Sequence, residues 1–384
     1  MINITSPSDC CGCTACQSVC NHKAILMIED KKGFLYPRTD KSKCVDCGIC
    51  ERVCPIATRK QDLRKEHVLA AYALRNRDEE VLKNSSSGGC FSVLANYVIR
   101  KGGTVYGAAY SKDMRVNHIR IDSFEELYIL RGAKYSQSDL RGVYKKVRED
   151  LQDKKLVLFT GTPCQVDGLN KYLRQSWDNL ITTDVICHSI PSPQVFKRYK
   201  ELLESEFHKS IVGINMKDKT YGWGIDCVKY FFADGSECTN PPKYPNWVSM
   251  FESGLFTRES CFDCQYTNLD RPSDFTIGDF WDFNNNRPDI RSNKGTSVVL
   301  LNTEKAIHLF EAIKSKADIW GITREDFIQP RLVSCSIKPQ KYDSFWDDYF
   351  KYDFKKVVKK YFVISIVKRI IGIIKRMLKF CKQK

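Results

Sequence analysis

Residues 10–20 read CCGCTACQSVC, and residues 44–55 read CVDCGICERVCP. Each stretch contains C-x2-C-x2-C-x3-C, in which three closely spaced thiolates share a loop and the fourth lies a helical turn away. Proteins bind cubane 4Fe-4S clusters with this spacing, and in two-cluster domains the fourth cysteine of each run binds the other cluster. We therefore predict two clusters. Their ligands are Cys10, Cys13, Cys16 and Cys54 for the first, and Cys44, Cys47, Cys50 and Cys20 for the second.

Zinc sites and disulfide bonds are the alternative uses of so many cysteines. Zinc usually takes two C-x2-C pairs separated by a longer knuckle, not four thiols in one compact run. Disulfides need an oxidising compartment, and the first residues, MINITSPSD, lack the basic and apolar regions of a secretion signal. With eighteen cysteines in 384 residues, we expect a reduced, cytoplasmic metalloprotein.

The formal net charge of +15 is concentrated at the C-terminal end. Residues 355–384 contain eleven Lys and Arg and no acid, so the first 354 residues carry only +4. Aromatic and basic residues are not interleaved in the pattern of a nucleic-acid-binding module. We therefore expect no nucleic-acid partner.

Two apolar strands are expected at residues 155–160 and 180–186, and a cysteine, Cys164 or Cys187, lies just past the carboxyl end of each. Ligands collect at the carboxyl edge of such βαβ units. With the pair Cys261 and Cys264, these thiols make four, enough for a third 4Fe-4S cluster. A zinc site from the same four residues and a redox dithiol at Cys261 and Cys264 remain alternatives. His188 is a candidate proton donor, or a structural histidine beside a ligand.

Two polar loops are candidate cofactor contacts. Residues 84–89, NSSSGG, run into an apolar stretch of helical period at 90–100. The free N–H groups of such a loop suit a phosphate, although serine at a helix start is also an ordinary cap. In the loop at 131–138, Lys134 suits a phosphate or a flavin edge, or is a solvated lysine.

The C-terminal segment has apolar residues at roughly helical spacing with Lys and Arg between them. Val357, Val358 and Tyr361 begin this apolar face, and Lys368 and Arg369 interrupt any span long enough to cross a bilayer. Such a basic amphipathic helix lies in the headgroup plane of an anionic membrane, or packs on a partner protein. We expect peripheral binding to the inner face of the cytoplasmic membrane.

The doubled cysteine motif, NSSSGGCFS, RGAKYSQS, GTPCQ, CHSIPSP and C-x2-C before SDFTIGDFW occur in this order. Together they resemble the beta-subunit family of coenzyme F420 hydrogenases and dehydrogenases, fused to an N-terminal dicluster ferredoxin domain. The resemblance implies FAD beside a 4Fe-4S cluster held by Cys164, Cys187, Cys261 and Cys264. It also implies flavin contacts from Ser86, Ser87, Gly88, Gly89, Lys134, Tyr135, Gln137 and Ser138.

The expected architecture has three parts. Residues 1–60 form an α+β ferredoxin-like dicluster domain, residues 67–335 a mixed α/β domain for FAD and a cluster, and residues 341–384 the basic amphipathic tail. We expect an oxidoreductase that passes electrons between ferredoxin or another redox partner and a small organic substrate. Surface-polysaccharide biosynthesis is the setting implied by similar tailed family members. A coenzyme F420 oxidoreductase subunit and a non-enzymatic electron-transfer or assembly subunit are the alternatives.

Overall fold

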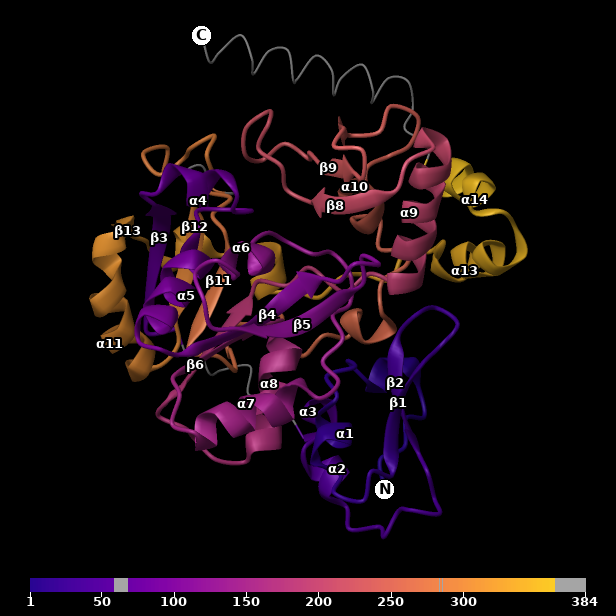
Figure 1. Ribbon diagram of the computed structural model, residues 1–384, viewed down its shortest axis with the longest axis horizontal. Coiled ribbons are helices and arrows are strands. Elements are labelled where there is room, and N and C mark those ends of the chain that lie inside the picture. The colour runs from indigo at the N-terminus through magenta and orange to yellow at the C-terminus, as the bar shows by residue number, and fades with distance from the viewer. Residues whose placement is uncertain (59–67, 283, 285, 363–384) are drawn as a thin grey trace.

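The computed structural model describes residues 1–58, 68–282, 284 and 286–362. Three regions pack together: an N-terminal domain, a domain built on an eight-stranded sheet, and a region around a three-stranded sheet (Figure 1). The ferredoxin-like domain followed by an α/β domain was therefore predicted correctly. The N-terminal elements are η1 (Pro7–Asp9), α1 (Ala15–Val19), the antiparallel pair β1 (Ile25–Glu29) and β2 (Leu35–Thr39), α2 (Ile49–Arg52) and α3 (Pro55–Thr58).

The large sheet has the strand order β13-β3-β12-β11-β7-β6-β4-β5. Strands β11, β7, β6 and β4 run parallel to one another, and the outer pairs are antiparallel. The strands are β3 (Ala70–Asn76), β4 (Thr104–Tyr110), β5 (Val116–Ile121), β6 (Val157–Gly161), β7 (Leu180–Val185), β11 (Phe275–Asp279), β12 (Ser297–Leu301) and β13 (Ala317–Gly321).

Both faces of this sheet are covered. In β12, Val299 and Leu301 point into the core that α5 (Cys90–Arg100) and α11 (Glu304–Ile313) complete, whereas Val298 and Leu300 join a second core on the opposite face. Helices α7 (Val143–Gln152) and α8 (Pro163–Leu173) cover the β6 half of that opposite face. Because both of its faces are buried, β12 is apolar from Val298 to Leu301.

The parallel strands end at one edge of the sheet. There β6 leads into α8, which begins with Pro163 and Cys164, and β7 leads to Cys187. Thr162 and Gln165 form a capping box, in which the backbone N–H of each residue donates to the side chain of the other. The chain therefore turns sharply at this point. Local capping therefore fixes the position of Cys164 relative to the sheet edge.

A smaller sheet lies beyond this edge, in the order β10-β9-β8. Its strands are β8 (Ile211–Asn215), β9 (Lys229–Phe232) and β10 (Glu237–Thr239), and its helices are α9 (Pro193–Phe207), α10 (Trp247–Phe251), α13 (Tyr342–Lys351) and α14 (Phe354–Tyr361). Short elements complete the described chain: α4 (Glu79–Lys83), α6 (Leu127–Leu130), η2 (Glu259–Cys261), η3 (Lys314–Lys316), α12 (Arg324–Phe327) and η4 (Pro330–Leu332).

The beginning of the expected C-terminal tail is part of this core. Val357 and Val358 are 1% and 2% exposed and pack in the cluster that includes Tyr199 and Trp247. The expectation that these two valines face a membrane is therefore wrong, because an amphipathic pattern arises equally from packing on the protein's own core. The remainder of the tail, residues 363–384, lies outside the described residues. Among the helices that are described, none has the length and apolar character needed to cross a bilayer.

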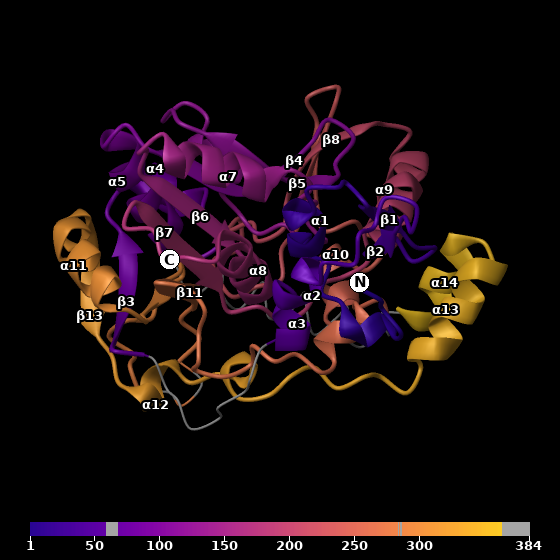
Figure 2. The ribbon, with the colours of Figure 1, turned by 90° about the horizontal axis from the view of Figure 1, so that it is seen from below.

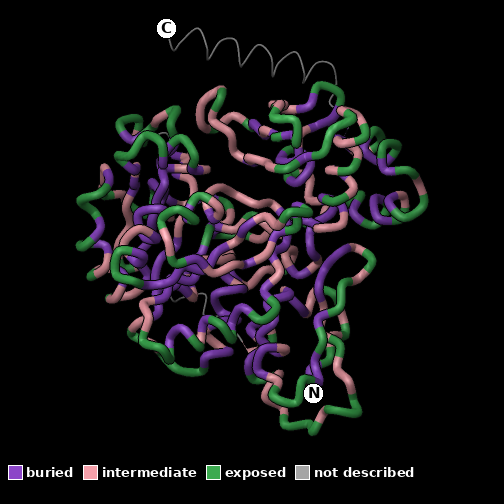
Figure 3. Tube along the Cα trace, in the orientation of Figure 1, coloured by how far each residue is buried: buried purple, intermediate pink, exposed green. Residues whose placement is uncertain are grey.

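The N-terminal domain docks on the α/β domain. Figure 2 shows α1, α2 and α3 beside α8, and the Thr14 hydroxyl contacts the carbonyl oxygen of Leu140 at 3.4 Å. On the other side of the domain, Lys32 forms an ion pair with Glu259 at 2.8 Å. Figure 3 shows buried chain where the domains meet and exposed chain along the outer edge of the N-terminal domain.

Candidate functional site

The first set of thiols gathers at α1. Cys10 and Cys13 lie in the loop before this helix, Cys16 lies in the helix, and Cys54 comes from the second motif, just after α2. Burial raises the pKa of the Cys16 thiol, and the nearby Cys10 and Cys54 raise it further. The backbone N–H of Gly12 donates to Cys10 Sγ at 3.3 Å. The structure thus places the fourth cysteine of the second run beside the first run, as the ligand exchange between the two runs requires.

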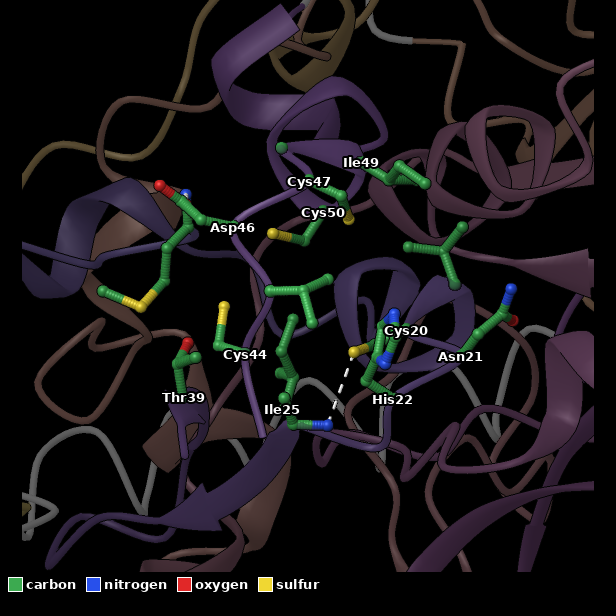
Figure 4. A pocket seen from close by; sticks show the side chains of 15 residues that line it. Cys20, Asn21, His22, Ile25, Thr39, Cys44, Asp46, Cys47, Ile49 and Cys50 are labelled. Atoms are coloured by element: carbon green, nitrogen blue, oxygen red, sulfur yellow. Dashed lines mark hydrogen bonds and ion pairs between the residues drawn. The ribbon is translucent and has the colours of Figure 1, made fainter. Parts of the chain in front are cut away.

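The second set of thiols lines a cavity of about 130 Å³ at the outer end of the domain (Figure 4). Cys20 lies there with Cys44, Cys47 and Cys50. The backbone N–H of Ala24 donates to Cys20 Sγ at 3.4 Å, and the backbone N–H of Ile2 donates to Cys50 Sγ at 3.3 Å. Such donors stabilise negative charge on cluster sulfurs.

The third set of thiols lies at the carboxyl edge of the large sheet. Burial raises the pKa of the Cys187 thiol well above its ordinary value, and Cys261, Cys164 and Cys264 add to this shift. A backbone contact explains why Cys261 and Cys264 arrive here: the N–H of Ser192 donates to the carbonyl of Phe256 at 2.9 Å. The four cysteines that the sequence grouped are therefore neighbours.

Crowded, buried thiols of this kind suit iron–sulfur clusters. Burial and mutual repulsion oppose thiolate formation in the first and third sets, and a bound metal reverses that preference by supplying positive charge. Within the described part of the chain, no three His, Cys, Asp or Glu side chains close around a point suited to a single metal ion. In a cubane, each thiolate binds a different iron, so the ligands stand further apart than around zinc.

Cys11, which the sequence analysis left without a role, connects the first and third sets. Its thiol interacts with the thiols of Cys13 and Cys164, and the residue is partly buried. Helix α8, which carries Cys164, packs directly against Cys13 of the first set, since a Cβ at Gly168 would lie 2.9 Å from Cys13 Sγ. The first and third sets are therefore adjacent, and the second set lies at the outer end.

The loops predicted to bind a flavin are in contact with each other. The backbone N–H of Ala133 donates to Ser86 Oγ at 2.7 Å, which joins the 84–89 loop to the 131–138 loop. Ser87 Oγ donates to the carbonyl of Thr296 at 2.8 Å. A Cβ at Gly88 would lie 2.1 Å from the carbonyl oxygen of Leu74, so this glycine is required by the packing of β3. Gly89 caps α5 with a φ of 82°.

Four residues of the second loop contact the protein itself. The ammonium of Lys134 donates to the carbonyls of residues 129, 131 and 132 at 2.7–3.2 Å, and burial lowers its pKa to about 7. Tyr135 stacks on Phe251 with ring centroids 5.0 Å apart. Gln137 and Ser138 bind Arg258 and His118 respectively, at 2.9 and 2.6 Å.

His188 lies near a polar group that the sequence analysis did not single out. Burial lowers the pKa of His188, with smaller effects from Arg331, Lys217 and Asp279. Lys217 forms an ion pair with Asp279 at 2.6 Å and lies 4.8 Å from the ring centroid of Trp281. These side chains stand beside a hollow of about 20 Å³ that Lys217 and Trp281 help to line. Asp279 ends β11, next to the strand that leads to Cys187.

The hollow also adjoins the 84–89 loop. Trp223 stacks on Trp281 with centroids 4.7 Å apart and donates from Nε1 to the carbonyl of Ser86 at 3.2 Å. Lys219 donates to the carbonyl of Ser87 at 2.7 Å. The loop at 219–224, which contains two glycines and two aromatic residues, therefore joins the candidate flavin loop to the sheet edge that carries Asp279.

Two stretches of the chain match known protein domains. Residues 154–324 match the family model for the C-terminal part of the coenzyme F420 hydrogenase/dehydrogenase beta chain, and residues 9–58 match the 4Fe-4S dicluster domain. The F subunit of the F(420)H(2) dehydrogenase of Methanosarcina mazei is 22% identical over 231 residues, covering 54% of this chain. The match spans 64% of that relative, less than two thirds of its length. A chain of the F420-reducing NiFe hydrogenase complex from Methanosarcina barkeri is 15% identical, with a TM-score of 0.45, over 66% of this chain and 82% of that one.

Proposed function

Because residues 154–324 match the coenzyme F420 hydrogenase/dehydrogenase beta-subunit family model and residues 9–58 match the 4Fe-4S dicluster domain, we propose that the chain is an iron–sulfur flavoprotein oxidoreductase. Electrons enter at the second thiol set, pass to the first, and reach a third cluster at the sheet edge. The adjacency of the first and third sets, through the contact of Cys11 with Cys13 and Cys164, is the observation that carries this proposal.

A flavin is the cofactor that such an arrangement needs. Iron–sulfur clusters transfer one electron at a time, whereas most organic substrates are reduced by two electrons together. A flavin can exchange electrons singly or in pairs. We place FAD where the loops at 84–89, 131–135 and 219–224 meet. The contacts of Ser86 with Ala133 and Trp223 support this location. Cys187 and His188 come from the adjoining sheet edge.

We place a small organic substrate beside Trp223 and Trp281. His188 and the Lys217–Asp279 pair lie at the same edge and are the chain's own groups for orienting a polar substrate and exchanging a proton. Precursors of surface polysaccharides are the substrate class to be tested first. Coenzyme F420 is the second candidate, because the relative from Methanosarcina mazei is by name part of an F(420)H(2) dehydrogenase.

Reduction by defined donors tests this function. We expect anaerobically purified protein to contain about one FAD per chain, and reduced ferredoxin to bleach its flavin absorbance. Bleaching only by reduced coenzyme F420 would replace the first substrate proposal with the second. Protein with its clusters but without flavin would contradict both, and would leave an electron-transfer or assembly role.

A charge variant checks the location of the flavin. Ser86→Asp puts a carboxylate where we place the cofactor, so the flavin content should fall several-fold through repulsion of its phosphates. The control Ser236→Asp lies in the hairpin turn before β10 and should keep its flavin. Equal flavin content in the two variants would argue against this location.

We also propose that the basic C-terminal segment binds an anionic membrane surface. The burial of Val357 and Val358 means that the shortest informative truncation ends after Phe362. That truncation removes seven Lys and Arg and should abolish flotation with vesicles rich in phosphatidylserine but leave the flavin and iron content unchanged. Equal flotation of the truncated and full-length chains would contradict this proposal.

A further inference from the structure

Arg258 is a fully buried cation at the junction of the domains. It is 0% exposed and immediately precedes η2, which ends at Cys261. Its guanidinium donates from Nε to the carbonyl of Cys10 at 2.7 Å and from Nη2 to the carbonyl of Leu35 at 2.9 Å. A third bond runs from Nη1 to Gln137 Oε1 at 2.9 Å. Two of its three acceptors therefore belong to the N-terminal domain.

These three acceptors are all uncharged oxygens. Glu259, the acid next to it in sequence, forms its ion pair with Lys32 instead, and among the described residues Arg258 shares an ion pair with no Asp or Glu. The guanidinium lies 4.3 Å from the ring centroid of Tyr36. Burying a cation without an opposite charge is costly, so its counter-charge must come from other neighbours.

Those neighbours are cysteines of two different sets. Arg258 bonds the carbonyl of Cys10, and the N–H of Cys261 donates to the carbonyl of Arg258 at 3.0 Å; both cysteines and Cys11 interact electrostatically with the guanidinium. The first set contains Cys10 and the third contains Cys261. The side chains of Gln137 and Arg258 pack tightly against Gly12, since a Cβ at Gly12 would lie 2.3 Å from Gln137 Nε2 and 3.1 Å from Arg258 Nη1. The cation is thus held against the loop that begins the first set.

We propose that Arg258 is a positioning residue whose charge raises the reduction potentials of the first and third clusters relative to the second. A cluster gains negative charge on reduction, and a cation in a low-dielectric surrounding stabilises the reduced form. Because the first cluster then has a higher potential than the second, the charge favours electron transfer from the second cluster to the first. For the third cluster, this inference rests on the proposed function.

Potentiometric titration monitored by electron paramagnetic resonance tests the inference on the intact, cluster-loaded protein. In Arg258→Met, the ratio of reduced to oxidised first cluster at a fixed potential should fall at least tenfold, which corresponds to about 59 mV for one electron. The third cluster should shift in the same direction. The second cluster, with Cys20, Cys44, Cys47 and Cys50 at the outer end, should keep its potential and serves as an internal reference.

Two further variants separate charge from packing. Arg258→Lys keeps the charge, so its potentials should lie closer to those of the wild type than to those of Arg258→Met. Arg198→Met removes a guanidinium that likewise bonds a carbonyl and lies over an aromatic ring, that of Tyr349, and should shift none of the potentials. Equal shifts in the Lys and Met variants, or an unshifted first cluster in Arg258→Met at full iron content, would overturn the proposal.

Gln137→Glu covers the case in which Arg258→Met fails to assemble. A carboxylate at this position would neutralise the guanidinium that now bonds Gln137 Oε1, so the potential of the first cluster should again fall, and an unchanged potential overturns the proposal. If the wild type lacks a third cluster, the proposed electron path fails while the shift of the first cluster still decides the role of Arg258.

Discussion

The double substitution Cys164→Ser and Cys261→Ser should lower the iron content from about twelve atoms per chain to about eight. The two thiols belong to the set at the carboxyl edge of the large sheet, where burial and the neighbouring thiols raise the pKa of Cys187. A serine hydroxyl does not replace a thiolate on iron at neutral pH, and two missing ligands leave too few for a cubane. Iron and acid-labile sulfide analysis of anaerobically purified protein measures the loss.

The same double variant should break the path to the flavin. The clusters of the N-terminal domain do not use Cys164 or Cys261, so dithionite should still reduce them. Reduced ferredoxin should no longer bleach the flavin at the wild-type rate, because the carrier beside it is missing. A flavin that is reduced as fast as in the wild type would show that electrons bypass the third set.

Two controls make the iron count specific. Cys227→Ser with Cys238→Ser also removes two thiols, but from the small-sheet region, and should leave about twelve irons. Cys335 donates to the carbonyl of Phe262 at 3.1 Å and interacts with Cys264, so it is a candidate substitute ligand. Adding Cys335→Ser to the double variant excludes such a substitution. Iron that stays at about twelve in this triple variant would contradict a third cluster.

The grouping of the cysteines was predictable because its signal is local or follows from topology. The spacing within residues 10–54 sets which thiols can share a loop, and parallel strands bring Cys164 and Cys187 to one edge. The role of Arg258 was not predictable in this way. Its bond to Cys10 joins residues 248 positions apart, and an arginine before a turn has no pattern that distinguishes burial from exposure.

The polar loop at 131–138 shows a different limit of sequence reasoning. A Lys, Gln or Ser in a loop has the same local signal whether it contacts a cofactor or the protein's own backbone. The ammonium of Lys134 binds carbonyls of its own loop and of α6, and Gln137 binds Arg258. The C-terminal pattern is ambiguous for the same reason, since Val357 and Val358 pack on α9 and its neighbours.

The ion pair between Asp184 and Arg271 should be among the largest single contributions to stability. Nη2 of Arg271 lies 2.6 Å from Asp184 Oδ1, and the two side chains are 1% and 0% exposed. Arg271 also donates from Nη1 to the carbonyl of Tyr266 at 2.6 Å. The pair therefore ties the segment after Cys264 to β7, which leads to Cys187.

Removing one partner leaves a buried charge without compensation. Asp184→Ala should lower the free energy of unfolding by about 3–5 kcal/mol, and anaerobic urea titration followed by circular dichroism measures this loss. The control Asp178→Ala changes an exposed acid two residues before β7 and should stay within about 0.5 kcal/mol of the wild type. Replacing both partners, with Asp184→Leu and Arg271→Met, should recover most of the loss because no buried charge remains. If the double variant were as unstable as Asp184→Ala, the cost would come from packing at the sheet edge and not from the unpaired guanidinium.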